Sequence, residues 1–319
     1  MMTTVGIIYG GNTIESGCSY RSASILYDTL SELPYNIKMI DIGDKNWMVT
    51  LSEQKLDLLI DLVYGCPGQE GTIKGLADIN QVKYLGSDIF THSLIKDKYI
   101  SKLVAIDQNI ATPRFLNVTS KDYYKMPQKY HEMIADQIGY PCIVKPRRKG
   151  GLSLGISYCQ NQHEISKCFE NVFHYDDCAL IEQYILGREV SVCVVLINDV
   201  LTVLPMIEVL IEDGAHICNY DTKMKGKRKL CIPANISVET RNEISKISTK
   251  LFSAFGARDF CYFDFIIGND IYFIEAGATP GLTETSNLTL ALKEYNMDVA
   301  NFFFQLINKR VVTDECTVN

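Results

Sequence analysis

Long hydrophobic runs, a net positive charge and a basic leader segment are all missing from this 319-residue chain. No apolar run approaches the roughly 18 residues that a membrane-spanning helix needs, so we expect no membrane partner. The net charge is −7 with both signs dispersed, which gives no field directed at nucleic acid. The first residues lead directly into a predicted strand, so we expect no signal peptide and a cytoplasmic location.

Paired cysteines and clustered histidines are also missing. Eleven cysteines are present, but none are spaced C-x-x-C, and several lie inside apolar runs, such as Cys193 in VSVCVVLI and Cys261 in FCYFDFII. This pattern favours buried free thiols in a reducing compartment over a disulfide framework. The five histidines show no metal-ligand spacing, so we expect no zinc site.

The first 92 residues alternate predicted strands with predicted helices. The strands are 5–11, 37–42, 56–65 and 82–86, and the helices are 21–33 and 72–80. Such alternation is typical of a parallel α/β sheet, in which ligands gather at the carboxyl ends of the strands. We therefore predict an N-terminal α/β domain over residues 1–92.

Two further segments follow, and the chain is long enough for two or three domains. Residues 93–185 begin with the helix-like stretch SLIKDKYISKLVAID and continue as strand, Gly-rich basic loop, strand, helix and strand. Residues 186–319 contain long apolar strand runs and a predicted helix over 239–256. The sequence therefore predicts an α/β chain whose C-terminal half is α+β, with a central domain over 93–185 and a C-terminal domain over 186–319.

A basic, glycine-rich loop follows Lys145 in the stretch CIVKPRRKGGLSLG. Cations and glycines between strands can form a lid whose backbone N–H groups reach phosphate oxygens. The spacing does not match the Walker A pattern, and no helix follows the loop. A solvated basic hairpin therefore remains an alternative interpretation.

The run CYFDFIIGNDIYFIEAG (261–277) predicts a β-hairpin around the turn Gly-Asn-Asp. If the loop consists of Asn269 and Asp270, Asp264 lies directly opposite Glu275 with the two Cβ atoms about 5 Å apart. Like charges in that position are unfavourable unless a cation lies between them, and Mg²⁺ takes carboxylate ligands together with nucleotide phosphates. Two carboxylates on an open sheet face are the alternative, because the inference depends on the register.

In this order, these motifs resemble the D-alanine–D-alanine ligase family of the ATP-grasp superfamily. The similarity covers nearly the whole chain. It is carried by IIYGGNTIESGCSYRSA (7–23), YGCPGQEGTIKGL (64–76), YLGS (84–87), IKDK (95–98), YPCIVKP (140–146), LIEQYILGREV (180–190), YDTK (220–223) and FIEAGATPGLTETS (273–286). The resemblance implies an ATP-grasp architecture in which the central and C-terminal domains hold a nucleotide between them.

The resemblance also implies a reaction. ATP phosphorylates a carboxylate, and the amine of a second substrate then attacks the acyl phosphate, which yields an amide, ADP and phosphate. The cofactors would be ATP and Mg²⁺, which stabilise charge on the transferring phosphoryl group. The partners would be small amino-acid substrates, and the family suggests a homodimer.

Roles for individual residues follow from the resemblance alone. On the nucleotide side, Lys98, Lys145 and Ser153 would lie at the phosphates, Glu182, Tyr184 and Ile185 at the adenine, Glu189 at the ribose, and Asp264 and Glu275 at Mg²⁺. On the substrate side, Glu15 would bind the ammonium of the first amino acid, and Lys223, Tyr262, Gly281 and Ser286 would serve the second substrate and the phosphoryl group.

Several positions depart from the family pattern. Gly277 stands where the family usually has an asparagine that binds a second Mg²⁺, so we expect one firm metal site. Tyr262 stands where the family usually has arginine. In the predicted register Tyr262 lies opposite Gly277, so an aromatic ring can cover the space that the glycine leaves. The two departures therefore look like one coupled change.

Other departures lie elsewhere in the chain. Tyr64 replaces a usual histidine, Met224 replaces a usual tyrosine, and the serine pair of the basic loop keeps only Ser153. Three functions stay open: a ligase for different substrates, a D-alanine–D-alanine ligase with divergent geometry, and a nucleotide-binding homologue without chemistry. For Glu15, an alternative role is that of a carboxylate favoured by the dipole at a helix N-terminus.

Overall fold

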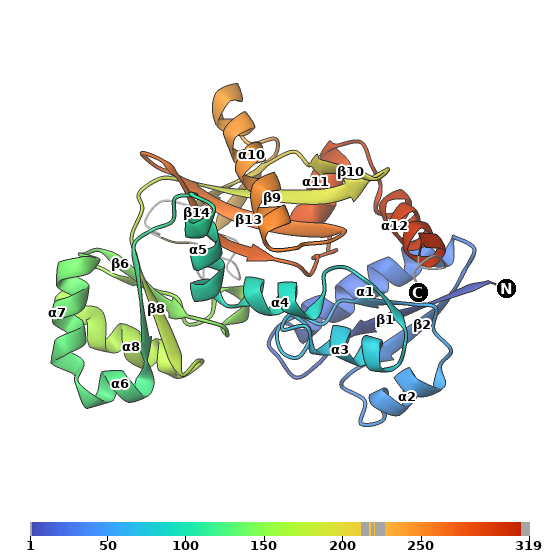
Figure 1. Ribbon diagram of the computed structural model, residues 1–319, viewed down its shortest axis with the longest axis horizontal. Helices are drawn as coiled ribbons and strands as arrows, with labels where there is room; N and C mark the ends of the chain where they lie inside the picture. Colours follow the sequence, from blue (N-terminus) through green and yellow to red (C-terminus); the bar gives the residue numbers. More distant parts are fainter. Residues whose placement is uncertain (1, 212–216, 218–219, 221–226, 314–319) are drawn as a thin grey trace.

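The structure is a computed structural model that describes residues 2–211, 217, 220 and 227–313, and it contains three sheets (Figure 1). Lys223 and Met224, which the sequence analysis singled out, lie outside the described residues. Within these ranges, no helix combines the length and the apolar character that crossing a membrane requires.

The N-terminal sheet is parallel, with strand order β2-β1-β3-β4. Its strands are β1 (Thr3–Tyr9), β2 (Tyr35–Asp41), β3 (Leu58–Asp61) and β4 (Lys83–Leu85), and its helices are α1 (Ser16–Ser31), α2 (Trp47–Glu53) and α3 (Thr72–Ile79). The predicted parallel α/β arrangement is confirmed. Strand β3 ends four residues earlier than predicted because Asp61 turns the chain by accepting a hydrogen bond from the Val63 N–H at 2.8 Å.

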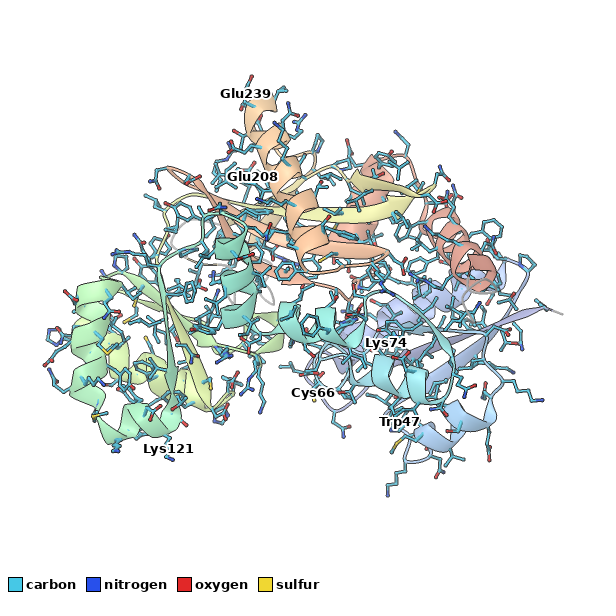
Figure 2. The ribbon with its side chains drawn as sticks, in the orientation of Figure 1. Trp47, Cys66, Lys74, Lys121, Glu208 and Glu239 are labelled. Carbon is cyan, nitrogen blue, oxygen red and sulfur yellow. The ribbon has the colours of Figure 1, made fainter. Side chains whose placement is uncertain are left out.

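The single tryptophan, Trp47, begins α2 at the outer end of the N-terminal sheet, away from the region where the three sheets meet (Figure 2). Its ring packs against the core that β1 and β3 share with α3. Its fluorescence therefore reports the folding of the N-terminal sheet rather than events at the centre of the molecule.

The central sheet is antiparallel, with strand order β5-β8-β6-β7. Its strands are β5 (Phe115–Thr119), β6 (Cys142–Pro146), β7 (Ser157–Cys159) and β8 (Cys178–Gln183), and its helices are α6 (Ser120–Lys125), α7 (Pro127–Gln137) and α8 (Ile165–Phe173). One face packs Val144 and Ile181 against Phe169 of α8. Because side chains alternate along a strand, Lys145 and Glu182 lie on the opposite face.

The C-terminal sheet is antiparallel, with order β12-β11-β9-β13-β14, and β10 pairs with β9. Its strands are β9 (Arg188–Ile197), β10 (Val200–Val203), β11 (Ile207–Ile211), β12 (Arg228–Cys231), β13 (Phe260–Ile267) and β14 (Ile271–Gly277). Helix α10 (Val238–Ala254) covers one face, on which Phe263 and Phe265 are buried. Helices α11 (Asn287–Glu294) and α12 (Val299–Thr313) cover the other face, which shares a core with α1 and β1.

The predicted helix over SLIKDKYISKLVAID is two helices, α4 (Ile89–Lys96) and α5 (Lys98–Asp107). They separate at Asp97, whose carboxylate accepts hydrogen bonds from the backbone N–H groups of Tyr99 and Ile100 and so caps α5. Both helices pack along β14, and α5 also reaches the central sheet through Tyr99, whose ring packs against Phe115 of β5. The domain boundaries at 92/93 and 185/186 remain a prediction.

The β13–β14 hairpin differs from the predicted one in two ways that compensate. The loop has three residues, 268–270, because Ile267 pairs with Ile271. A β-bulge between Asp264 and Phe265 then shifts the register by one residue. The predicted two-residue loop was therefore wrong, but the predicted opposition of Asp264 to Glu275 and of Tyr262 to Gly277 is confirmed.

Candidate functional site

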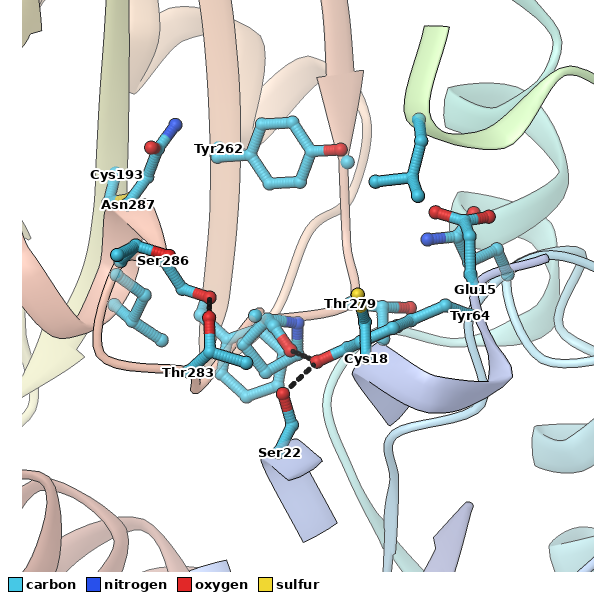
Figure 3. Close-up of a pocket in the computed structure, with 18 of the residues that line it drawn as sticks. Glu15, Cys18, Ser22, Tyr64, Cys193, Tyr262, Thr279, Thr283, Ser286 and Asn287 are labelled. Carbon is cyan, nitrogen blue, oxygen red and sulfur yellow. Dashed lines mark hydrogen bonds between the residues drawn. The ribbon is translucent and has the colours of Figure 1, made fainter. Parts of the chain in front are cut away.

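Two adjoining cavities lie where α1, the basic loop and the C-terminal sheet meet. The larger is about 370 Å³ and the smaller about 200 Å³. Glu15, Leu152, Tyr262 and Gly277 line both, so the cavities share a wall. Figure 3 shows residues that line the larger cavity. Of the predicted site residues, Gly281 and Ser286 line the larger cavity, and Lys98, Ser153 and Glu275 line the smaller one.

Glu15 is buried at the wall common to both cavities. It precedes α1, but its side chain makes no capping hydrogen bond to that helix. A Cβ atom built on Gly151 would overlap the Glu15 carboxylate, so the basic loop approaches this carboxylate closely because residue 151 is glycine. This position favours a ligand-binding role for Glu15 over a purely helix-capping one.

Asp264 and Glu275 face each other across β13 and β14, as a site for a divalent cation requires. Lys98 lines the smaller cavity together with Glu275. Burial lowers the pKa of the Lys98 ammonium to about 8, and the Glu275 carboxylate acts in the opposite direction. Glu275 and Lys98 thus bring an anionic and a cationic group to the smaller cavity, and Asp264 lies on the strand beside it, opposite Glu275.

The ring of Tyr262 lies over Gly277. A Cβ atom built on Gly277 would overlap the Cε1, Cζ and Oη atoms of Tyr262. Burial raises the pKa of the Tyr262 phenol well above its ordinary value, and the Glu275, Asp264 and Glu15 carboxylates raise it further. Tyr262 is therefore a neutral hydrogen-bonding group at the wall between the two cavities, and the predicted contact between the two positions is confirmed.

A buried ion-pair cluster joins β6 and β8, the two inner strands of the central sheet, to α5. The Glu182 carboxylate lies 2.9 Å from the Lys145 Nζ and 2.9 Å from the Lys102 Nζ, and all three side chains are at most 4% exposed. Burial alone would raise the pKa of the Glu182 carboxyl, but the Lys102 and Lys145 ammonium groups lower it below its ordinary value. The Glu182 side chain is thus engaged with lysines, so an adenine contact at this position would come from the backbone.

The remaining residues predicted at the nucleotide lie along the connection from β8 to β9. The Tyr184 ring packs edge-on against the Tyr158 ring, with the two ring centroids 5.1 Å apart, and Ile185 is buried. Glu189 lies on β9 with its side chain on the same sheet face as Ser191. None of these three residues lines the two cavities, whose described linings lie farther along the sheet.

The end of the larger cavity opposite Glu15 is lined by hydroxyl groups. The Thr283 Oγ1 and the Ser286 Oγ lie 2.7 Å apart, and Ser286 precedes the first turn of α11. The Asn287 amide donates to the Ser191 Oγ at 2.8 Å. Figure 3 shows this group facing Glu15 across the pocket. The N-terminus of α11 adds a partial positive charge at this end.

Tyr64 connects the N-terminal sheet to the loop before α11 by hydrogen bonds. Its hydroxyl lies 2.8 Å from the Ser22 Oγ and donates to the Pro280 carbonyl at 2.9 Å (Figure 3). The Leu282 N–H donates to the same Ser22 Oγ at 3.2 Å. Tyr64 therefore fixes the position of this loop relative to α1 and forms part of the cavity wall.

The basic loop is anchored at its start. The Arg147 guanidinium contacts both carboxylate oxygens of Asp97 at 2.7–2.9 Å, and the N–H groups of Arg148 and Lys149 donate to Asp176. Residues 150–153 then line the smaller cavity. This arrangement differs from a freely solvated hairpin, which was the alternative interpretation.

Asp176, Asp177 and Cys178 are the one group of three possible metal ligands within 4.8 Å among the described residues. Asp176 already accepts hydrogen bonds from the basic loop, and the Asp177 carboxylate pairs with Arg148 at 3.0 Å. These contacts account for the cluster as a support for the loop, so we assign no metal to it.

Comparison with known proteins identifies the family. The family described as "D-ala D-ala ligase C-terminus" matches residues 104–308. The chain belongs to the D-alanine–D-alanine ligase family. A D-alanine–D-alanine ligase of Coprothermobacter proteolyticus is 30% identical over 307 residues, covering 94% of this chain and 97% of the relative.

Solved structures of this family share the fold. The VanG D-Ala:D-Ser ligase from Enterococcus faecalis superposes with a TM-score of 0.82 at 22% identity, covering 97% of this chain and all of that one. The D-alanine–D-alanine ligase from Bacillus anthracis in complex with ATP gives 0.81 at 20% identity, covering 99% of this chain and all of that one. The predicted ATP-grasp architecture is therefore confirmed.

Some residues of this family member's site were missed by sequence reasoning. Lys102 follows Lys98 by one helical turn, a spacing that places both on one face of α5. Asn287 directly follows Ser286, so its position beside a predicted site residue could have identified it. Arg21, which lines the larger cavity, lies within the motif 7–23 but was not singled out there. Arg228 lines the same cavity and lies in none of the motifs.

Proposed function

We propose that this chain is an ATP-dependent carboxylate–amine ligase that joins two amino acids through an acyl phosphate. The donor carboxylate attacks the γ-phosphorus of ATP and releases ADP. The amine of the acceptor, after losing a proton, attacks the acyl carbon, and phosphate leaves. We further propose that the substrates differ from two D-alanines, because Tyr262 and Gly277 change the wall of the site.

The opposition of Asp264 to Glu275 is the observation that carries this proposal. Their oxygens are the ligands that Mg²⁺ prefers, and both residues would hold that ion. When bound, Mg²⁺ would neutralise charge on the phosphates during transfer. Gly277 supplies no side chain for a second ion. Lys98, in the same cavity as Glu275, would contact a phosphate oxygen.

The two ends of the larger cavity suggest how the substrates are oriented. Glu15 offers a carboxylate at one end, which suits the ammonium of the donor amino acid. The Ser286 and Thr283 hydroxyls and the N-terminus of α11 lie at the other end (Figure 3), and they suit the carboxylate of the acceptor. The Tyr262 hydroxyl lies between the ends and would donate a hydrogen bond to the oxygen that develops charge during acyl transfer.

ADP release over a panel of L- and D-amino acids, supplied singly and in pairs with ATP and Mg²⁺, tests this proposal. We expect release to require two amino acids and to fall by about 10²–10⁵-fold in Glu275→Gln, since removing a metal ligand weakens charge stabilisation at the phosphoryl group. ATP with Mg²⁺ should also raise the melting temperature, because a ligand of the folded state stabilises it.

The opposite results would favour the other two functions. A clear rise in melting temperature with ATP but no ADP release with any pair would indicate a nucleotide-binding homologue without chemistry. Release that is fastest with D-alanine alone would indicate a D-alanine–D-alanine ligase. No response to ATP up to millimolar concentration would contradict nucleotide binding itself.

Glu15→Gln tests the assignment of the donor end. We expect the KM of the first amino acid to rise about tenfold or more while the KM of ATP stays unchanged, because a charge-assisted hydrogen bond becomes a neutral one. Steady-state kinetics with each substrate varied in turn would measure this. Equal rises in both KM values would show instead that Glu15 has a structural role.

A further inference from the structure

Two guanidinium groups line the larger cavity. Arg21 comes from α1 and Arg228 from β12. Among the residues that the structure describes, neither forms an ion pair, although Arg21 donates a weak hydrogen bond to the Cys18 Sγ at 3.6 Å. Glu15 is the single acidic residue in the described lining of this cavity. The described lining of this cavity therefore carries two positive charges and one negative charge.

The strand register directs Arg228 toward the site. Arg228 pairs with Ile211, and Ile207 on the same strand pairs with Ser191 of β9. Because side chains two residues apart share a sheet face, Arg228 lies on the face that carries Ser191 and Tyr262. Lys229, the next residue, points to the opposite face and pairs with Leu210.

The position of the two arginines argues against a role at the nucleotide. The smaller cavity, where Lys96 and Lys98 lie, is lined by neither Arg21 nor Arg228. The acceptor's own α-carboxylate already has suitable donors at Ser286 and the N-terminus of α11. Two cations thus remain for a further anionic group within the same cavity.

We propose that the acceptor is a dicarboxylic amino acid of the aspartate or glutamate class, whose side-chain carboxylate binds Arg228, with Arg21 of the same cavity as a second contact. This inference rests on the proposed ligase function and names its second substrate class. Arg228 is half-buried, so its charge is less screened than that of the exposed Arg21. A guanidinium also matches a carboxylate in a bidentate geometry.

Pairs of acceptors that differ only in charge test this proposal. ADP release is measured for aspartate against asparagine and for glutamate against glutamine, in both enantiomers, with the donor that the panel identifies. We expect kcat/KM for the dicarboxylic acceptor to exceed that of its amide by about 30-fold or more, the range of a charge-assisted bidentate contact. Equal values for acid and amide would overturn the proposal while leaving the ligase function intact.

Variants assign the effect to Arg228. Arg228→Ala should remove most of the preference for the acid over the amide, Arg228→Lys should restore part of it, and Arg21→Ala should weaken it less. Lys229→Ala is the matched control, because this neighbouring cation faces away from the cavity, and it should keep the preference. A preference that survives in the double Arg21→Ala, Arg228→Ala variant would also overturn the proposal.

The proposal can be decided even without turnover. If no pair supports ADP release, the proposed ligase function fails, and binding is measured directly by the rise in melting temperature with ADP and Mg²⁺ present. A larger rise with aspartate or glutamate than with its amide, lost in Arg228→Ala, would support the anion site. Equal rises, or none with either, would overturn it.

Discussion

Replacement of Glu182 by alanine is expected to lower the free energy of unfolding by about 3–5 kcal/mol, one of the largest effects of any single substitution in this chain. The Glu182 carboxylate lies 2.9 Å from the ammonium groups of both Lys102 and Lys145. Without it, two positive charges would remain buried beside each other with no anion between them. Urea denaturation followed by circular dichroism would measure the loss.

A matched control distinguishes burial from ion pairing alone. Glu208 is also buried and pairs with Arg188 at 2.7 Å, but the Arg188 side chain is 46% exposed. Water can solvate that guanidinium after Glu208→Ala, so the expected loss is smaller, about 1–2 kcal/mol. Lys102→Met should likewise cost less than Glu182→Ala, because Glu182 keeps Lys145 as a partner. Equal losses for Glu182→Ala and Glu208→Ala would contradict this account.

The ion-pair cluster also bears on how the nucleotide would be held. Lys145 is 3% exposed and lies on the face of the central sheet opposite its helices. If Glu182 holds the Lys145 ammonium in place, Glu182→Ala should weaken the stabilisation by ATP as well as the fold. Lys102 comes from α5, which contacts β14, so the cluster links the central sheet to the strand that carries Glu275.

The fold could be predicted from the sequence wherever a local pattern of apolar and turn residues determines the secondary structure. Alternation of strands and helices in the first 92 residues indicated the parallel sheet, and β-rich runs around a turn indicated the β13–β14 hairpin. The bulge beside Asp264 left no signal, because a one-residue irregularity depends on how β13 packs against β9 as well as against β14. The pairing of Asp264 with Glu275 and of Tyr262 with Gly277 was still predicted correctly, because the longer loop and the bulge shift the register in opposite directions.

Site residues could be predicted from the sequence where they lie within a recognisable motif. Glu15, Asp264, Glu275 and Ser286 lie within motifs, and the structure brings them to the cavities or to the facing strands beside them. Arg228 could not be predicted, because its place depends on the pairing of β12 with β11 and of β11 with β9. Such a chain of pairings brings together residues far apart in sequence without leaving a local pattern.

The contact between Tyr262 and Gly277 leads to the second prediction of large effect. A side chain at position 277 would overlap the tyrosine ring, so Gly277→Asn alone should lower the free energy of unfolding by about 1–3 kcal/mol, as overpacking does. Tyr262→Arg replaces the ring with a flexible cation that can move aside. In that background Gly277→Asn should cost less, with a coupling energy of about 0.5–3 kcal/mol.

Activity should follow the same non-additive pattern. We infer that Tyr262 and Gly277 replace an arginine and an asparagine of the family, so the double variant restores both a cation and a neutral metal ligand. Its rate of ADP release should exceed that of Gly277→Asn by about 10²-fold, the scale of one donor at developing charge. If the substrates differ from D-alanine, the double variant should also gain activity with D-alanine relative to the present acceptor.

Gly17→Asn provides the control for these measurements. A Cβ atom built on Gly17 meets nothing within 4 Å, so this substitution should leave stability nearly unchanged and should combine additively with Tyr262→Arg. Unfolding free energies and ADP-release rates of the four variants at positions 262 and 277 form a double-mutant cycle. Effects that add within about 0.5 kcal/mol would mean that the two side-chain positions do not constrain each other, and the coupled change at the wall of the site would have to be abandoned.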